Sequence, residues 1–185
     1  RGSGEGIRPT VSRTRRRPDS HASLLAMDPL AWLGLRNSRG AHEHLDAMQT
    51  MLRELLPDGE GVVIRYIVIV ATLLTRVAHA DGRFLDSERD HLKVLFQHID
   101  GMPPEGIERL CTSLCEHAPR ITDSDLELCY REIKSLCDAS ERRQIMRLLA
   151  RQANADGIIH AAEHATLRAI ASELGVPDEE MDEIE

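Results

Sequence analysis

The chain has 185 residues, a length that suits one ordinary domain with a short extension. Apolar residues make up 42% and aromatic residues only 3%, a balance that favours helix-on-helix packing and argues against a β-sandwich or barrel. The formal net charge is −8, and an acidic protein is not expected to present a nucleic-acid-binding surface.

Residues 1–26 form a basic stretch without hydrophobic periodicity. Six arginines stand against Glu5 and Asp19, so this stretch carries +4 and residues 27–185 carry −12. Such a composition is typical of a disordered tail, or of a vector-derived or read-through segment, with a basic targeting arm as the less favoured alternative. We expect the native protein to start at Met27 and residues 27–185 to form a single helical domain.

The first predicted helix covers residues 41–56 and is followed by a Pro-Asp-Gly stop. The next segment, residues 62–80, is so rich in β-branched residues that it also fits a strand. A buried central helix that is apolar nearly all round has the same composition. Its apolar run, residues 62–74, contains Arg65 and is shorter than a bilayer span, so we predict no membrane-spanning segment.

The remaining helices have clear start or stop signals. Two prolines open a helix that runs to about His117, and a glycine closes the helix over residues 161–174. An acidic turn or short helix ends the chain. The residues that carry these signals are Pro103, Pro104, Thr122, the capping box of Asp138 and Glu141, Gly175 and Pro177.

Four cysteines lie on the apolar stripes of these helices, without any C-x-x-C spacing. They are expected to be buried, reduced thiols, which indicates a cytoplasmic protein. If their two helices face each other, a four-thiolate metal site is the alternative. The four are Cys111, Cys115, Cys129 and Cys137.

A shift of 75 residues superimposes two stretches of the chain. Residues 78–84 read AHADGRF and residues 153–159 read ANADGII, and the apolar positions after them coincide. Each unit therefore reads as helix, Ala-x-Ala-Asp-Gly loop, helix and Gly-x-Pro turn. Because residues 145–153 have helical periodicity, the equivalent residues 70–78 are predicted to be helical rather than a strand. The predicted repeat units cover about residues 58–117 and 139–185.

Each loop has an interpretation that needs no ligand. Its glycine supplies the positive φ that ends the incoming helix. Glu88 and Glu163 lie in the first turn of the outgoing helix, where a carboxylate accepts free backbone N–H groups. Phe84 and Ile159 are expected to enter the core. On this interpretation the acidic residues are helix caps.

The alternative interpretation of the loops is cation binding. Asp81 and Glu88, like Asp156 and Glu163, have the D-G-x5-E spacing of the second half of an EF-hand loop. The first half is missing from the first copy, which has Val and His at the two preceding ligand positions. The second copy keeps side-chain oxygens there, so it is the better candidate, with weak affinity. Its auxiliary donors are Gln152 and Asn154.

At these residues the sequence resembles the tellurite-resistance TerB-like family. The similarity is strongest over residues 141–180 and is repeated at VAHADGRFLDSERDHL, within residues 73–99. It implies an all-α domain of about seven helices with an internal two-fold repeat, no enzymatic reaction, cation binding through the acidic loops and assembly into larger complexes. The family usually has Ser, Thr or Asp before the outgoing helix, where this chain has Leu85 and His160, so capping must differ. The residues to which the resemblance assigns cation binding are Asp81, Glu88, Asp156 and Glu163.

The run from His160 to His164 spells H-x-x-E-H, a zinc-protease signature. Its counterpart in the first repeat has Leu85 and Arg89 in place of the two histidines, so Glu163 is explained by the duplication. Only 21 residues follow His164, which leaves little room for a further ligand and a substrate cleft. We therefore predict no enzyme, and zinc bound by the two histidines alone is a minor alternative.

Two other charged features have simple interpretations. His42 and His44 are two residues apart, so they are expected on different faces of a helix and not to chelate a metal. The acidic end, residues 178–185, is expected to be solvated, with an interaction tail as the alternative.

Three functional hypotheses follow. The first is a cytoplasmic binding module that holds a divalent cation, calcium before zinc, and docks with other proteins of a stress-response assembly or with copies of itself. The second is a structural adaptor whose acidic residues serve only as caps. The third, a remote alternative, is a zinc hydrolase at His160, Glu163 and His164.

Overall fold

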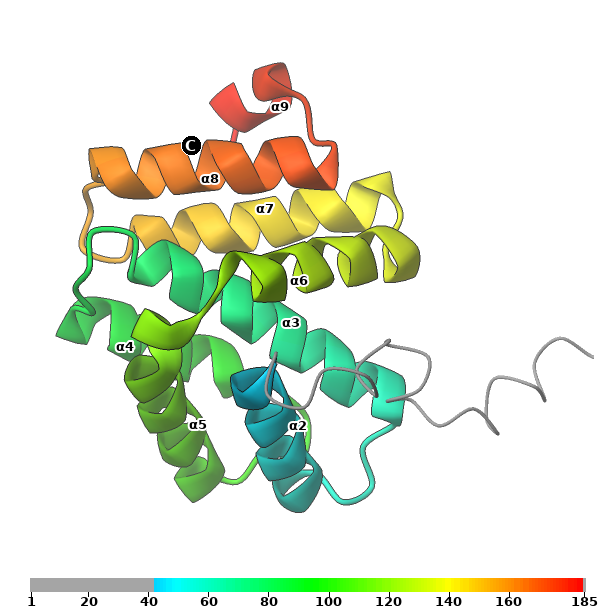
Figure 1. The fold of residues 1–185 in the computed structure, drawn as a ribbon. Helices are drawn as coiled ribbons and strands as arrows, with labels where there is room; N and C mark the ends of the chain where they lie inside the picture. Colours follow the sequence, from blue (N-terminus) through cyan, green and yellow to red (C-terminus); the bar gives the residue numbers. More distant parts are fainter. Residues whose placement is uncertain (1–41, 185) are drawn as a thin grey trace, which may run out of the picture. The chain divides into compact units, whose positions relative to one another are not determined.

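The computed structural model describes residues 42–184, and these form eight α-helices, one 3-10 turn and no strand (Figure 1). The all-α prediction is confirmed, with one helix more than the approximate seven. The predicted tail, residues 1–26, and the predicted domain start at Met27 lie outside the described residues. The elements are α2 (Glu43–Leu55), α3 (Gly61–Ala78), α4 (Asp86–Phe96), α5 (Pro104–His117), η2 (Ala118–Arg120), α6 (Asp123–Leu136), α7 (Ala139–Ala153), α8 (Ala161–Leu174) and α9 (Asp178–Asp182).

Helix α3 is the centre of the fold and contacts α2, α5, α6, α7 and α8. Leu73 and Val77 are fully buried within it. Thr72 and Thr75 are also fully buried, and each donates its hydroxyl to the carbonyl oxygen four residues earlier, at 2.8 Å. The β-branched residues therefore belong to a helix, as the comparison of the two loops predicts, because tertiary burial outweighs their strand propensity.

The same helix is long and apolar enough to cross a membrane by length and composition. However, 61% of Gly61–Ala78 is buried inside the fold. Because a core helix surrounded by other helices has this combination, its hydropathy is explained by packing.

The predicted helix signals lie where the sequence places them. Asp138 Oδ1 accepts the Glu141 N–H at 2.9 Å, and Glu141 Oε2 accepts the Asp138 N–H at 2.7 Å, which completes the capping box of α7. Thr122 caps α6, and its hydroxyl oxygen accepts the Asp125 N–H at 3.3 Å. Gly175 ends α8 in the left-handed conformation, with φ of +69°. Local sequence signals therefore set these boundaries.

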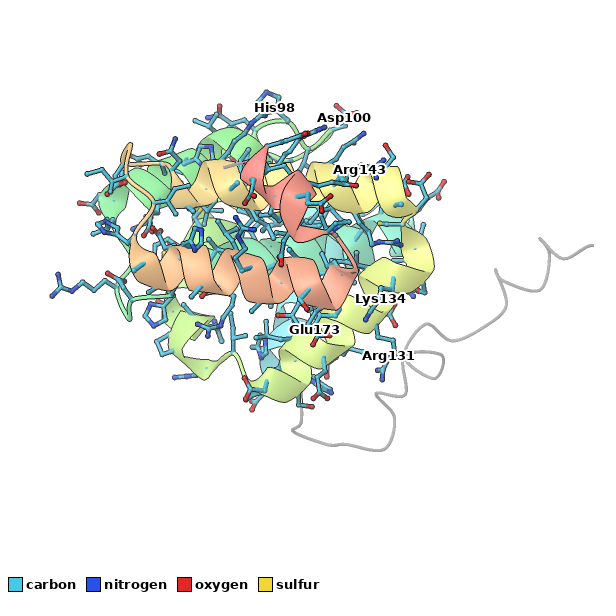
Figure 2. All side chains as sticks on the ribbon, turned by 90° about the horizontal axis from the view of Figure 1, so that it is seen from above. His98, Asp100, Arg131, Lys134, Arg143 and Glu173 are labelled. Carbon is cyan, nitrogen blue, oxygen red and sulfur yellow. The ribbon has the colours of Figure 1, made fainter. Side chains whose placement is uncertain are left out.

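Surface ion pairs connect the C-terminal helices. In Figure 1, α7 and α8 run side by side and α9 lies on the outer side of α8. The Arg168 guanidinium donates to the Asp178 carbonyl at 3.1 Å and to Asp182 Oδ1 at 2.5 Å, which fixes α9 on α8. Lys134 of α6 and Glu173 of α8 face each other, with 3.9 Å between Nζ and Oε2 (Figure 2). Such exposed pairs contribute little stability, so they orient the helices more than they hold them.

The cysteines behave as small core residues. Cys111, Cys129 and Cys137 are buried, Cys115 is half-buried, and all four are free thiols. Burial raises the pKa of the Cys111 thiol to about 11, so it is protonated at neutral pH. Within residues 42–184 no three or more Cys, His, Asp or Glu side chains are grouped to hold a metal, so the four-thiolate alternative has no support.

Candidate functional site

The two Asp-Gly loops have the same hydrogen bonds. Asp81 Oδ1 accepts the Arg83 N–H at 2.9 Å, and Asp156 Oδ1 accepts the Ile158 N–H at 3.0 Å. The glycine after each aspartate has a positive φ, +83° in the first loop and +90° in the second. Each aspartate therefore closes a small turn with one oxygen of its side chain, immediately before the outgoing helix.

The two glutamates cap the outgoing helices α4 and α8. Glu88 Oε2 accepts the Leu85 N–H at 2.6 Å, and Glu163 Oε2 accepts the His160 N–H at 2.7 Å. A leucine side chain has no acceptor, and His160 makes no side-chain bond to the first turn, so each helix has only the glutamate half of a capping box. This arrangement explains how α4 and α8 begin without a Ser, Thr or Asp at the cap.

The structure brings Glu88 and Glu163 together, although they lie 75 residues apart in the sequence. Both side chains are buried, with 5% and 4% of their surface exposed, and their carboxyl groups hydrogen-bond to each other. Burial, followed by the charge of Glu163, raises the pKa of Glu88 to about 7. Burial also raises the pKa of Glu163. At neutral pH the pair therefore holds a proton part of the time.

The two aspartates lie next to this pair but nearer to solvent. Asp81 and Asp156 are exposed, and their charges act on Glu88 and Glu163 respectively. Of the four sequence-predicted carboxylates, the structure thus brings only the two glutamates together, and within residues 42–184 no three or more Asp, Glu, His or Cys side chains are grouped to hold a metal. We call Glu88, Glu163, Asp81 and Asp156 the acidic site.

The residues expected to support the loops differ in their surroundings. Gln152 is fully buried, and its Oε1 lies 2.8 Å from His91 Nδ1 while its Nε2 donates to the Glu88 carbonyl oxygen at 3.1 Å. Gln152 therefore connects α7 to α4, and its oxygen already has a partner. Asn154 is the exposed C-cap of α7.

The apolar residues of the two loops were expected to enter the core. Phe84 and Ile159 are instead only half-buried. Each follows its Asp-Gly turn directly and precedes the cap of the outgoing helix, so the backbone keeps it at the surface of the fold.

The residues of the H-x-x-E-H run differ in burial. His160 precedes α8 and is exposed, with its Nε2 3.5 Å from Asp156 Oδ2. His164 is also exposed, whereas Glu163 is buried against Glu88. A zinc hydrolase needs a carboxylate and its metal ligands in one cleft, and this arrangement does not provide one.

The structure contains a second polar cluster that the sequence did not predict. His42 and His44 both contact the buried Asp125, at 2.5 Å and 3.5 Å from Nδ1 to the carboxylate oxygens. The expectation that they point apart was wrong, because His42 precedes the first turn of α2 and is not bound to helical geometry. Burial by itself would raise the pKa of Asp125, but hydrogen bonds from Thr122 and His42 outweigh it and lower that pKa. Asp125 is therefore an ionised carboxylate inside the fold.

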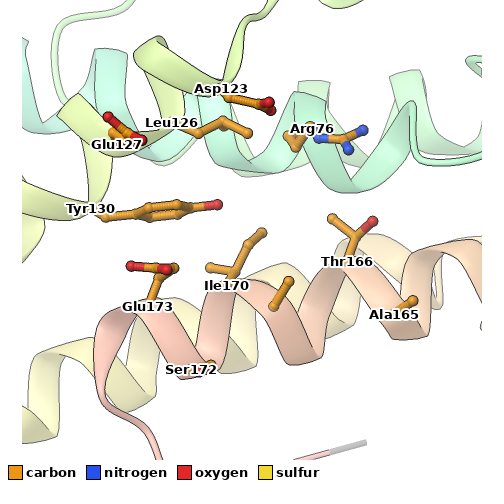
Figure 3. Close-up of a pocket in the computed structure, with 11 residues that line it drawn as sticks. Arg76, Asp123, Leu126, Glu127, Tyr130, Ala165, Thr166, Ile170, Ser172 and Glu173 are labelled. Atoms are coloured by element: carbon orange, nitrogen blue, oxygen red, sulfur yellow. The ribbon is translucent and has the colours of Figure 1, made fainter.

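A cavity lies between α6 and α8, and none of the four carboxylates of the acidic site lines it (Figure 3). It measures about 620 Å³, and Tyr130 extends along it above Ile170. Its polar rim combines Arg76 with Asp123 and Glu173, and burial raises the pKa of Tyr130 to about 12. This open groove lacks a convergent set of reactive groups, so cavity size alone does not identify a functional site here.

Comparison with known proteins supports one assignment. The family model described as tellurite resistance protein TerB matches residues 68–185, more than half of the chain. The match includes both Asp-Gly loops and therefore the whole acidic site. No curated protein and no solved structure matches the chain.

Proposed function

Because the chain belongs to the TerB family of tellurite-resistance proteins, we propose that it is a non-enzymatic, cytoplasmic stress-response module that responds to divalent cations at its acidic site. In this role it docks with other proteins of a stress-response assembly, and cation binding at the loops changes the stability of the module. The observation that carries the proposal is the contact between the buried carboxyl groups of Glu88 and Glu163.

Two carboxylates buried side by side repel each other, and a proton or a cation relieves that repulsion. Carboxylate oxygens are the ligands that Ca²⁺ and Mg²⁺ prefer, and the charges of Asp81 and Asp156 act on Glu88 and Glu163 respectively. One oxygen of each of the four side chains already accepts a backbone N–H. A cation there is therefore shared with water molecules and held weakly. Zn²⁺ fits less well, because the acidic site lacks nitrogen and sulfur donors.

The adaptor hypothesis has an observation of its own. All four carboxylates of the acidic site have a backbone N–H partner, so helix capping accounts for the two glutamates and turn formation for the two aspartates without any ligand. On this alternative the chain contributes only a rigid helical surface to its assembly, and cations leave it unchanged.

A titration with CaCl₂ and MgCl₂, followed by calorimetry and NMR, separates the two hypotheses. The chosen variant is Glu163→Gln, because the amide oxygen still accepts the His160 N–H while the charge is lost. We expect saturable binding to the unchanged protein and at least tenfold weaker binding to Glu163→Gln. Asp100→Asn is the matched control, since Asp100 is an exposed carboxylate remote from the loops (Figure 2). Absence of saturable binding, or equal binding to both variants, favours the adaptor.

A further inference from the structure

The groove between α6 and α8 is lined by apolar side chains along its length (Figure 3). Leu126 and Ile170 line it and are themselves buried, and the half-buried Tyr130 extends along it. On the α8 side, Ala165 and Ala169 are exposed. Because alanine side chains are short, a further helix can approach α8 closely here. The volume of about 620 Å³ is large enough for several apolar side chains.

The charged residues of the groove are mainly acidic. Asp123, Glu127 and Glu173 are exposed carboxylates, and Arg76, from the last turn of α3, is the one cation among the lining residues. Asp123 and Glu127 are four residues apart on α6, so they lie on the same side of that helix, about 6 Å apart along its axis. The groove therefore attracts a segment that carries positive charge.

The fold uses few of these charges for itself. Among residues 42–184, Arg76, Asp123 and Glu127 have no ion-pair partner, and the Tyr130 hydroxyl makes no hydrogen bond. Elsewhere, charged side chains connect neighbouring helices, as Glu173 does with Lys134 of α6 at 3.9 Å. A partner can therefore pair with Asp123 and Glu127 without breaking an ion pair of the described fold.

We propose that this groove is the docking site for a basic amphipathic helix of a partner protein. The apolar face of that helix covers Tyr130 and Ile170, and its Lys or Arg side chains pair with Asp123 and Glu127. A helix suits the groove because basic residues three or four positions apart on it match the spacing of the two carboxylates.

The inference rests on the docking part of the proposed function and names the surface and the kind of partner. It does not depend on cations, because none of the four carboxylates of the acidic site lines the groove.

The test uses the full chain and a fluorescein-labelled synthetic peptide of leucine and lysine, about four helical turns long, with its leucines on one face. A peptide of the same composition with the leucines spread around the helix is the control probe. Fluorescence anisotropy measures binding of both peptides. We expect saturable binding of the amphipathic peptide and at least tenfold weaker binding of the control peptide.

One variant blocks the groove. Ala169→Arg places a long, positively charged side chain among the lining residues, and we expect it to weaken peptide binding at least tenfold. Ala161→Arg is the matched control, because Ala161 is an exposed alanine of the same helix that does not line the groove. It is expected to bind like the unchanged protein. Both positions are at the surface, and circular dichroism checks the fold of each variant.

A second variant removes charge without adding bulk. Asp123→Asn together with Glu127→Gln is expected to weaken binding about fivefold, because exposed ion pairs contribute modestly. Glu179→Gln together with Glu183→Gln is the control, since these exposed carboxylates have the same spacing but do not line the groove. This control is expected to leave the affinity unchanged.

Glu163→Gln separates the groove from the acidic site and is expected to bind the peptide like the unchanged protein. Cation binding without peptide binding contradicts only the groove, and the reverse contradicts only the acidic site. The inference is overturned if peptide binding does not saturate, if Ala169→Arg and Ala161→Arg bind equally, or if the control peptide binds as tightly. It is also overturned if sedimentation shows a dimer that Ala169→Arg dissociates, because a second copy of the chain then occupies the groove.

Discussion

Glu88 has two interactions with opposite electrostatic effects. Its carboxylate accepts the Leu85 N–H, which stabilises the charged form, while burial and the charge of Glu163 favour the neutral form. The second group of effects is larger, since the pKa of Glu88 rises to about 7. A residue that caps a helix thereby also becomes sensitive to pH near neutrality.

The raised pKa predicts how stability depends on pH. Glu88 is protonated in both states below about pH 4.5. Between there and pH 7 the unfolded chain loses this proton more readily than the folded one, so stability falls as pH rises. Glu88→Gln removes this effect and keeps the cap. We expect the variant to be more stable than the unchanged protein at pH 8, by about 1 kcal/mol, and not at pH 4.5.

Urea denaturation of both proteins at the two pH values measures this difference. Glu116→Gln is the control, because Glu116 is an exposed glutamate on α5. An equal free energy of unfolding for Glu88→Gln and the unchanged protein at pH 8 contradicts the raised pKa.

Among the elements, the Asp-Gly loops depend on backbone conformation more than on packing. Gly157 has φ of +90°, and a Cβ added there meets nothing within 4 Å. Strain is therefore the only cost of Gly157→Ala, and we expect a loss of about 1–2 kcal/mol in the free energy of unfolding. Gly61 opens α3 with equally open space but without a positive φ, so Gly61→Ala is the matched control and is expected to be neutral or slightly stabilising. Thermal and urea unfolding compare the two; equal effects refute the strain argument.

The elements themselves could be predicted from the sequence because their signals are local. Thr122, Asp138 and Gly175 mark helix ends through bonds to residues three or four positions away. Helix α3 has no such signal, and its β-branched composition favours a strand when it is considered alone. The helical periodicity of the equivalent residues 145–153 is what predicts a helix rather than a strand here. A second copy of a motif therefore adds information that residue propensity lacks.

The sites of the whole molecule depend on distant contacts, and the sequence predicts these less well. It identifies Glu88 and Glu163 as equivalent, yet their contact depends on how α4 and α8 approach each other. Likewise, two histidines near the start of α2 meet Asp125 only because α2 lies beside the start of α6. Equivalent acidic residues in two copies of one loop are the signal that points to the first contact. The sequence carries no comparable signal for the second contact.

The family match begins at residue 68, inside α3, whereas the fold extends to α2. We therefore expect the fragment 68–185 not to fold cooperatively, and the fragment 42–185 to keep the full fold. The shorter fragment loses Leu52 and Ile64, which are 0% and 2% exposed, and α2 no longer covers α3 and α5. Each of these side chains contributes about 2 kcal/mol by burial, against a total stability of about 5–15 kcal/mol for a typical domain. Far-UV circular dichroism during heating compares the two fragments. A sharp transition in 68–185, at the temperature of the longer fragment, would mean that the region matched by the family model is stable without α2.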